Sequence, residues 1–426
     1  MQLASTVPFI PSQEMYLNCH TYYSLRFGTI SEVELLELAK KNHVDHLALT
    51  DINNTSAGLN FVRKAQEKGI KPILGIDFRN GVDPCFIGLA KNNYGYQELN
   101  NFLSEHLHHD KKFKSRAPIF NHAFVIYPFE KVLLNKQDAF LEHEFIGISI
   151  RDLRRLPFSK IMDFKDKLVV QQAVTFRNKR DFNAHRLLRA IDNNILLSKL
   201  SQSEEADPEE KMLPMEELLT AFSEYQYILE NTERLMQSCQ IYFDFSENRK
   251  PQNLVTYLGD RKKDEALLDE LCQKGLPERY KHTEIGHVIL ERLQKELDLI
   301  RKMGFVSYFL INWDIVSHAR KQGFIELDLY FERFINLYRV NPPDFDIDFS
   351  WRDREAMTQY IFERFPNVSL LGTYVTFQEK GVVRELGKVF GLPKEEIDVL
   401  CDKKYNVMEL DKVALLVLKY GQLLKG

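Results

Sequence analysis

The most informative stretch of the sequence is Pro343-Asp344-Phe345-Asp346-Ile347-Asp348-Phe349, in which three aspartates alternate with apolar residues. Successive side chains of a β-strand point to opposite faces, so the three carboxylates are predicted to share one face. Two carboxylates about 6.5–7 Å apart along a strand can reach a pair of cations about 3.5–4 Å apart, the arrangement of two-metal phosphoryl transfer. An edge strand whose aspartates only face water gives the same alternation, so alternation alone leaves both interpretations open.

Upstream of this stretch, the first 200 residues alternate predicted strands and helices. Ser31 and Glu34 form a capping box before an apolar helical stripe, and Gly69 supplies a left-handed stop after a second helix. Strands separated by helices of this length pair in parallel, which predicts an α/β fold and favours a barrel over an open sheet. Apolar runs typical of strands occupy 16–20, 46–50, 71–77, 84–90, 124–127, 145–150 and 168–174.

Length and composition indicate a soluble protein of two or three domains. The chain has 426 residues, 44% apolar residues and a formal net charge of −4, which excludes a strongly basic coat but not a local basic groove. Its five cysteines are dispersed and include no Cys-x-x-Cys pair, which argues against a zinc ribbon or a disulfide framework. The first residues do not have the pattern of a signal peptide, and no apolar run is long enough for a membrane helix. These features predict a cytoplasmic protein.

Several segments resemble bacterial DNA polymerase III alpha subunits. The first part of the chain resembles the polymerase and histidinol phosphatase (PHP) domain of these subunits, at Asn18–Leu25, Leu49–Asp51 and Gly69–Gly75. Later segments resemble the palm of these polymerases, at Leu297–Asp314, Leu329–Asn336, Pro343–Phe349, Leu371–Tyr374 and Lys380–Gly387. The motifs occur in the family's order, and the resemblance covers nearly the whole chain.

The resemblance implies a PHP-type (β/α) barrel followed by a mixed α/β polymerase palm and the start of a helical thumb. The corresponding regions are 14–200 for the PHP-like domain, 201–213 for an acidic loop or linker, 214–378 for the palm with a helical lead-in, and 379–426 for the start of the thumb. The acidic segment 201–213 is expected to form a surface loop.

By resemblance, the chain is expected to be a DNA-directed DNA polymerase that performs two-metal nucleotidyl transfer in DNA replication. Asp346 and Asp348 match two of the family's three catalytic carboxylates and are expected to bind two Mg²⁺ ions, whereas Asp344 is interpreted as structural or supporting. Arg333 and Arg339 fit two roles equally, as phosphate contacts or as counter-ions of the acidic strand. The implied partners are a DNA primer–template, deoxynucleoside triphosphates and replisome subunits, with no membrane.

The PHP metal site departs from the family's pattern at several positions. The leading His-x-His is Asn18-Cys19-His20, the Thr-Asp-His motif is Thr50-Asp51-Ile52, and the expected glutamate is Asp77. A later histidine is replaced by Cys85, and the Asp-x-His motif is Ala173-Val174-Thr175. His20, Asp51 and Asp77 are the ligands that remain, enough for one weakly held ion but too few for a multi-metal centre. We therefore expect a degenerate, structural PHP site.

Two further departures concern the polymerase region. The family has a Gly/Ser-rich loop that binds the triphosphate between the positions of Gly323 and Leu329. This sequence has no such loop between these two residues. The sequence ends at Gly426, before the segments that carry the family's fingers, clamp-binding motif and third carboxylate. We therefore expect a truncated polymerase chain, which is either active or inactive in nucleotidyl transfer. The alternative to polymerase activity is a non-enzymatic role in binding DNA or the replisome. A PHP-type phosphoesterase acting through His20, Asp51 and Asp77 ranks third.

Overall fold

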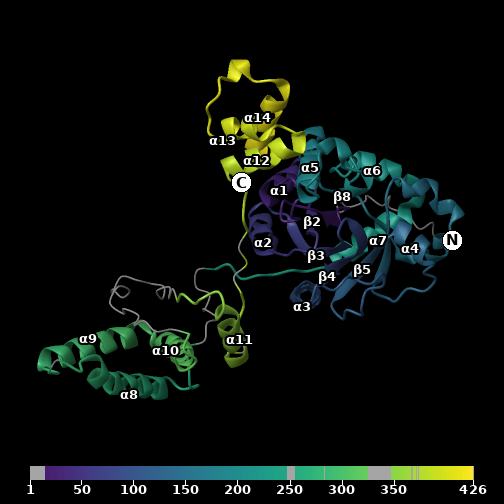
Figure 1. Cartoon of the computed structure of the whole chain (residues 1–426). Coiled ribbons are helices and arrows are strands. Elements are labelled where there is room, and N and C mark those ends of the chain that lie inside the picture. The colour runs from purple at the N-terminus through teal and green to yellow at the C-terminus, as the bar shows by residue number, and fades with distance from the viewer. Residues whose placement is uncertain are drawn as a thin grey trace, which may run out of the picture. The chain divides into compact units, whose positions relative to one another are not determined.

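A computed structural model describes residues 15–246, 255–282, 284–324, 347–365, 368–370, 372 and 374–425 (Figure 1). The chain forms two compact units, one of Met1–Glu247 together with Val375–Gly426 and the other of Asn248–Tyr374. Within the described residues, no helix is both long and apolar enough to cross a membrane.

The first unit is built on a curled half-barrel sheet with the strand order β2-β3-β4-β5-β6-β7. β4 runs antiparallel to both of its neighbours, and the other adjacent pairs are parallel. The short strands β1 and β8 pair in parallel, and a bridge from Tyr16 to Leu47 joins this pair to β2. The strands are β1 (Asn18–Cys19), β2 (His46–Leu49), β3 (Lys71–Asn80), β4 (Asp83–Ala90), β5 (Ala123–Pro128), β6 (Glu144–Ile148), β7 (Leu168–Val170) and β8 (Ala173–Val174).

The predicted α/β fold is confirmed, with one difference in strand direction. β3 and β4 form a hairpin across Gly81, whose φ of +66° suits glycine, so β4 returns antiparallel instead of following a crossover helix. The capping box is also confirmed: the Ser31 hydroxyl accepts from the Glu34 amide, and the Glu34 carboxylate accepts from the Ser31 amide. The helices of this region are α1 (Glu32–Lys41), α2 (Gly58–Glu67), α3 (Asn93–His108), α4 (Phe129–Asn135) and α5 (Lys179–Asp192).

Helices α6 (Met215–Ala221) and α7 (Gln226–Gln237) belong to the core of the first unit. The Asn231 amide donates to two carbonyls beside β7, at Lys165 and Leu168, and the Thr232 hydroxyl accepts from the Val170 amide at 2.8 Å. The compact unit therefore extends past the predicted domain boundary at residue 214, because α7 satisfies the polar groups of β7 and buries apolar side chains against the sheet.

Three C-terminal helices pack on α5 within the same unit (Figure 1). They are α12 (Glu379–Phe390), α13 (Lys394–Cys401) and α14 (Lys412–Leu424). Leu386 of α12 and Val417 of α14 are fully buried, and Leu187 of α5 lies in the same cluster. This small helical core is separate from the main core of the sheet.

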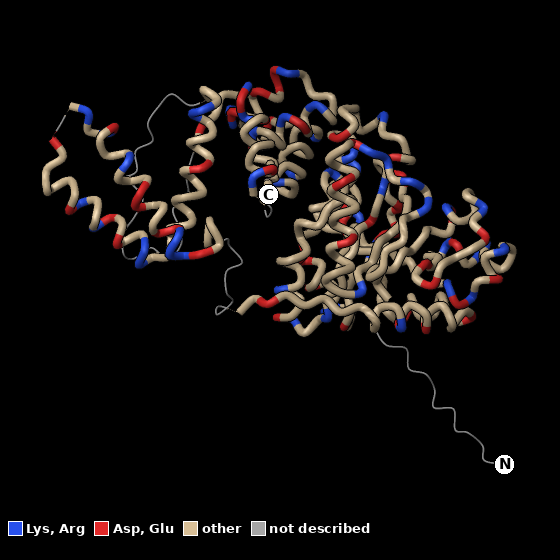
Figure 2. The backbone as a smooth tube through the Cα atoms, turned by 90° about the horizontal axis from the view of Figure 1, so that it is seen from below, with Lys and Arg blue, Asp and Glu red and all other residues tan. Residues whose placement is uncertain are grey.

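The second unit is helical throughout its regular described parts. Its helices are α8 (Arg261–Arg279), α9 (His287–Met303), α10 (Val306–Lys321) and α11 (Arg354–Arg364), and α8, α9 and α10 share a core that includes Leu268, Leu297, Ile300 and Leu310. Basic and acidic residues are interspersed along the helices (Figure 2). Pairs such as Arg261–Glu265 on α8 lie four residues apart, as expected for solvated helix faces.

Two glycines of α12 provide a matched test of the packing of α13 on α12. A Cβ at Gly387 would lie 2.6 Å from the Ile397 side chain, whereas a Cβ at Gly381 would meet nothing within 4 Å. We predict that Gly387→Ala destabilises the fold by about 1–3 kcal/mol through overpacking, and that Gly381→Ala is neutral or stabilises by up to about 1 kcal/mol through helix propensity. Urea unfolding followed by circular dichroism measures both, and equal effects of the two substitutions would contradict the close approach of α12 and α13.

Candidate functional site

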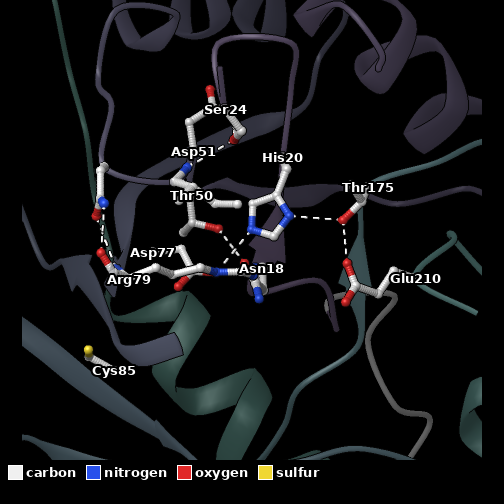
Figure 3. A network of polar contacts seen from close by, with 12 residues as sticks. Asn18, His20, Ser24, Thr50, Asp51, Asp77, Arg79, Cys85, Thr175 and Glu210 are labelled. Atoms are coloured by element: carbon white, nitrogen blue, oxygen red, sulfur yellow. Dashed lines mark hydrogen bonds and ion pairs between the residues drawn. The ribbon is translucent and has the colours of Figure 1, made fainter. Parts of the chain in front are cut away.

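The carboxyl ends of three parallel strands gather polar side chains of the first unit into one buried network of contacts, named the PHP pocket after the metal site of the family (Figure 3). His20 follows β1, Asp51 follows β2 and Thr175 follows β8, while Asp77 lies within the longer strand β3. A parallel bridge between Ile52 and Asp77 holds the segment after β2 against β3. Because the carboxyl ends of neighbouring parallel strands meet at one sheet edge, residues far apart in sequence become neighbours here.

Asp77 is the centre of this pocket. Its Oδ2 atom lies 3.1 Å from His20 Nε2 and receives two hydrogen bonds from Arg79, at 3.0 Å from Nε and 2.6 Å from Nη2. Asp77 is 1% exposed and Arg79 is 8% exposed. Burial by itself would raise the pKa of Asp77, but the charge of Arg79 and the hydrogen bond from His20 outweigh it and bring this pKa to about 2. The carboxylate is therefore ionised and neutralised by a side chain of its own strand.

Asp51 is also engaged by side chains of the pocket. Its Oδ1 accepts from the Thr21 amide at 2.6 Å and from the Ser24 hydroxyl at 2.7 Å, and its Oδ2 accepts from the Thr21 hydroxyl at 2.8 Å. Burial raises the pKa of Asp51 in spite of these hydrogen bonds. Both of its oxygens therefore already have donors within the loop that follows β1.

The other altered positions of the PHP pattern do not supply ligands. The Thr50 hydroxyl donates to the side-chain oxygen Oδ1 of Asn18 at 2.9 Å, and the Cys85 thiol receives a hydrogen bond from the side-chain nitrogen Nδ2 of Asn80 at 3.3 Å. Across the described part of the chain, no group of three or more His, Cys, Asp or Glu side chains is arranged to hold a metal ion. The residues of this pocket therefore do not fit the multi-metal centre of active PHP domains.

The acidic segment 201–213 reaches this pocket instead of forming only a surface loop. The Thr175 hydroxyl lies 2.9 Å from His20 Nδ1 and donates to Glu210 Oε2 at 2.5 Å. The backbone amides of Thr175 and Phe176 both donate to the Glu210 carbonyl. On the other side of the segment, Arg189 of α5 pairs with Glu204. The sequence did not predict these contacts, because they join residues 15 to 155 positions apart without a local pattern.

The predicted polymerase site lies largely outside the described residues. Asp344, Asp346, Arg333 and Arg339 are not described, so the structure does not test their arrangement. Asp348 is described and exposed, within a segment, Ile347–Ser350, that is assigned to no strand. The alternating-strand geometry and the metal-binding roles of Asp346 and Asp348 therefore stay predictions.

A second polar cluster, missed from the sequence, ties the helices of the second unit together. Asp314 of α10 accepts from the Tyr360 hydroxyl at 2.6 Å, from the Tyr257 hydroxyl at 2.8 Å and from Arg364 Nε at 2.9 Å. These hydrogen bonds and the charge of Arg364 outweigh the effect of burial and lower the pKa of Asp314. Because its oxygens are engaged by donors, Asp314 links α10 to α11 and acts as a structural group.

His185 of α5 is held in one protonation state by its backbone partners. Nδ1 lies 2.8 Å from the Phe27 carbonyl, which can only accept, and Nε2 lies 2.9 Å from the Ala206 amide, which can only donate. The ring is therefore neutral, with its proton on Nδ1. Burial, together with the positive charges of Arg189 and Arg79, lowers the pKa of His185 to about 4 despite the hydrogen bond to Phe27.

We predict that His185 makes the first unit less stable as the pH falls from 6.5 to 4. The folded state binds fewer protons than the unfolded state in this window, because an ordinary histidine titrates near 6.5, so about 3 kcal/mol of stability is present above pH 6.5 and lost below pH 4. His185→Gln removes this contribution, and the urea-unfolding free energies of the two proteins at pH 7.5 and 4.5 measure the difference. An unchanged pH dependence in the variant would contradict the neutral assignment.

Comparison with known proteins assigns the two parts of the chain. The family model of the PHP domain matches residues 17–140, and that of the bacterial DNA polymerase III alpha NTPase domain matches residues 266–326 and 324–415. An error-prone DNA polymerase of Symbiobacterium thermophilum is 25% identical over 96% of this chain and 44% of its own length. The DNA polymerase III alpha subunits of Bacillus subtilis and Escherichia coli K12 are 27% and 25% identical, over 91% and 90% of this chain and 39% of their own lengths.

The chain thus spans about two fifths of the length of these relatives. The two family models match in the same order as the segments that resembled a PHP domain and a polymerase palm. The chain is therefore similar to the bacterial DNA polymerase III alpha subunits, with a match to the PHP domain followed by matches to their NTPase domain.

Proposed function

We propose that this chain contributes to DNA-templated nucleotidyl transfer, with Asp346 and Asp348 as the ligands of two Mg²⁺ ions. The observation that carries the proposal is the position of the Asp-x-Asp-x-Asp alternation inside the 324–415 match to the alpha-subunit NTPase domain. An edge strand whose aspartates only face water would not be expected to fall within that match. The names of the relatives, DNA polymerase III subunit alpha and error-prone DNA polymerase, support the same reaction class.

The proposed roles follow from the charge of the side chains. Asp346 and Asp348 provide the anionic oxygens that Mg²⁺ prefers. Asp346 and Asp348 would hold Mg²⁺ there, and the bound ions would supply charge that lowers the pKa of the primer 3′-hydroxyl and neutralises the triphosphate. Arg333 and Arg339 lie close in sequence and are assigned either to phosphate contact or to charge balance of the aspartates. The partners are a DNA primer–template, deoxynucleoside triphosphates and replisome subunits.

A second candidate is a non-enzymatic role in binding DNA or a replisome partner. The observation that favours it is the sequence from Gly323 to Leu329, which lacks the Gly/Ser-rich triphosphate loop. A PHP-type phosphoesterase is less favoured than either, because the oxygens of Asp51 and Oδ2 of Asp77 already receive hydrogen bonds from neighbouring side chains.

Primer extension distinguishes the two leading candidates. With labelled primer–template, Mg²⁺ and the four deoxynucleoside triphosphates, the chain is expected to extend the primer, and Asp346→Ala and Asp348→Ala are each expected to reduce the rate at least about 100-fold through loss of a metal ligand. Glu355→Ala, an exposed carboxylate of α11, is the matched control and should retain activity.

Extension that survives Asp346→Ala would contradict the assignment of the site. If the unaltered chain binds DNA with an affinity that falls steeply with salt but does not extend the primer, the non-enzymatic candidate is favoured instead.

A further inference from the structure

We propose that Arg79 takes the place of a metal ion in the PHP pocket. Its guanidinium neutralises Asp77, so that the pocket holds the surrounding segments together without a metal. This inference concerns the pocket of the first unit and holds whether or not the chain extends primers. It rests on the charge, burial and contacts of the pocket residues (Figure 3).

The buried negative charge of Asp77 has to be balanced by a positive charge. Asp77 is 1% exposed, and an ionised carboxylate at that depth needs a cation beside it. Arg79 provides that cation through two hydrogen bonds to the same oxygen, Oδ2. A divalent ion at Oδ2 would therefore have to displace the guanidinium or lie beside its positive charge.

Contacts to both its backbone and its guanidinium hold Arg79 in place. Its amide donates to the Asn53 side-chain oxygen at 3.0 Å, and its carbonyl accepts from the Asn53 side-chain nitrogen at 2.8 Å. The guanidinium lies 5.0 Å from the centre of the Phe27 ring, a cation–π contact. Since the backbone and the guanidinium are both held, Arg79 is preorganised to face Asp77.

Few unoccupied ligand atoms remain for a metal ion. Both oxygens of Asp51 already accept hydrogen bonds from Thr21 and Ser24, and His20 Nε2 lies 3.1 Å from Asp77 Oδ2. Asp77 Oδ1 is buried and has no hydrogen-bond partner among the described residues. One free oxygen is not a coordination sphere, because structural and catalytic metal sites use at least three protein ligands.

The polar contacts of the pocket hold the acidic segment 201–213 against the sheet. A continuous series of polar contacts runs from Arg79 through Asp77, His20 and Thr175 to Glu210. The series starts within β3 and then joins it to the ends of β1 and β8 and to the segment 201–213. The pocket thus connects elements that a metal cluster would otherwise hold together.

Four measurements on the whole chain test this proposal. The purified protein is expected to contain less than about 0.1 equivalent of Mn, Fe or Zn by elemental analysis, and its thermal midpoint should not change with EDTA. Arg79→Ala should lower the midpoint by several degrees, because it leaves a buried carboxylate without its cation. Arg155→Ala is the matched control: Arg155 pairs with Glu130 at the surface, where both side chains are 55% exposed, so little change is expected.

Two further measurements separate a substituted cation from ordinary packing. Guanidinium chloride at about 10 mM should raise the midpoint of Arg79→Ala more than equal sodium chloride does, with no rise for the unaltered chain or Arg155→Ala. Asp77→Asn combined with Arg79→Ala should be more stable than Arg79→Ala alone, because the unpaired charge is gone.

The proposal is overturned by stoichiometric metal together with an EDTA-induced loss of stability in the unaltered chain. It is also overturned if Arg79→Ala behaves like Arg155→Ala, or if Asp77→Asn brings no recovery to the Arg79→Ala chain. Should Arg79→Ala fail to fold, the double variant and the metal content of the unaltered chain still decide the question. Primer extension is measured separately, so failure of the polymerase proposal does not affect these outcomes.

Discussion

The buried ion pair between Asp77 and Arg79 is the interaction on which the first unit's pocket depends. A carboxylate with 1% exposure is tolerated only when a cation and hydrogen bonds compensate its lost hydration. Arg79 supplies the charge from the same strand, and His20 supplies a further polar contact from the end of β1. The remaining polar side chains of the pocket are arranged around this pair, so that the loops after β1, β2 and β8 meet at one point.

This arrangement separates similarity in fold from chemistry. The PHP family model matches residues 17–140, and the curled sheet is the fold expected for that family. Asn18, Ile52, Cys85 and Thr175 depart from the ligand pattern that the resemblance implies, and the guanidinium of Arg79 is bound to Asp77. The fold is thus retained while the metal chemistry is not supported by the residues present. The catalytic proposal rests on the aspartates of the polymerase region alone.

Local patterns in the sequence predicted the parts of the fold that depend on local physics. The capping box at Ser31, the stop at Gly69 and the strand–helix alternation all follow from spacing within about ten residues. The antiparallel return of β4 was missed, although Asn80-Gly81 is a typical hairpin dipeptide. The packing of α7 on β7 could not be predicted, because amphipathic spacing shows that a helix has a buried face but not which sheet covers that face.

For the candidate site, the altered ligand motifs predicted a degenerate pocket, but its cation was not identified. Arg79 follows Asp77 by two residues on a strand, a spacing that places both on one face and could have indicated the pair. Glu210 and Asp314 gave no such signal, since their partners are distant in sequence.

Anomalous scattering from a crystal of the whole chain soaked in Mn²⁺ shows directly whether Arg79 or a metal ion neutralises Asp77. We predict guanidinium density against Asp77 Oδ2 and no manganese peak between His20 and Asp77. A manganese peak within about 2.5 Å of an Asp77 oxygen, with Arg79 displaced, would contradict it.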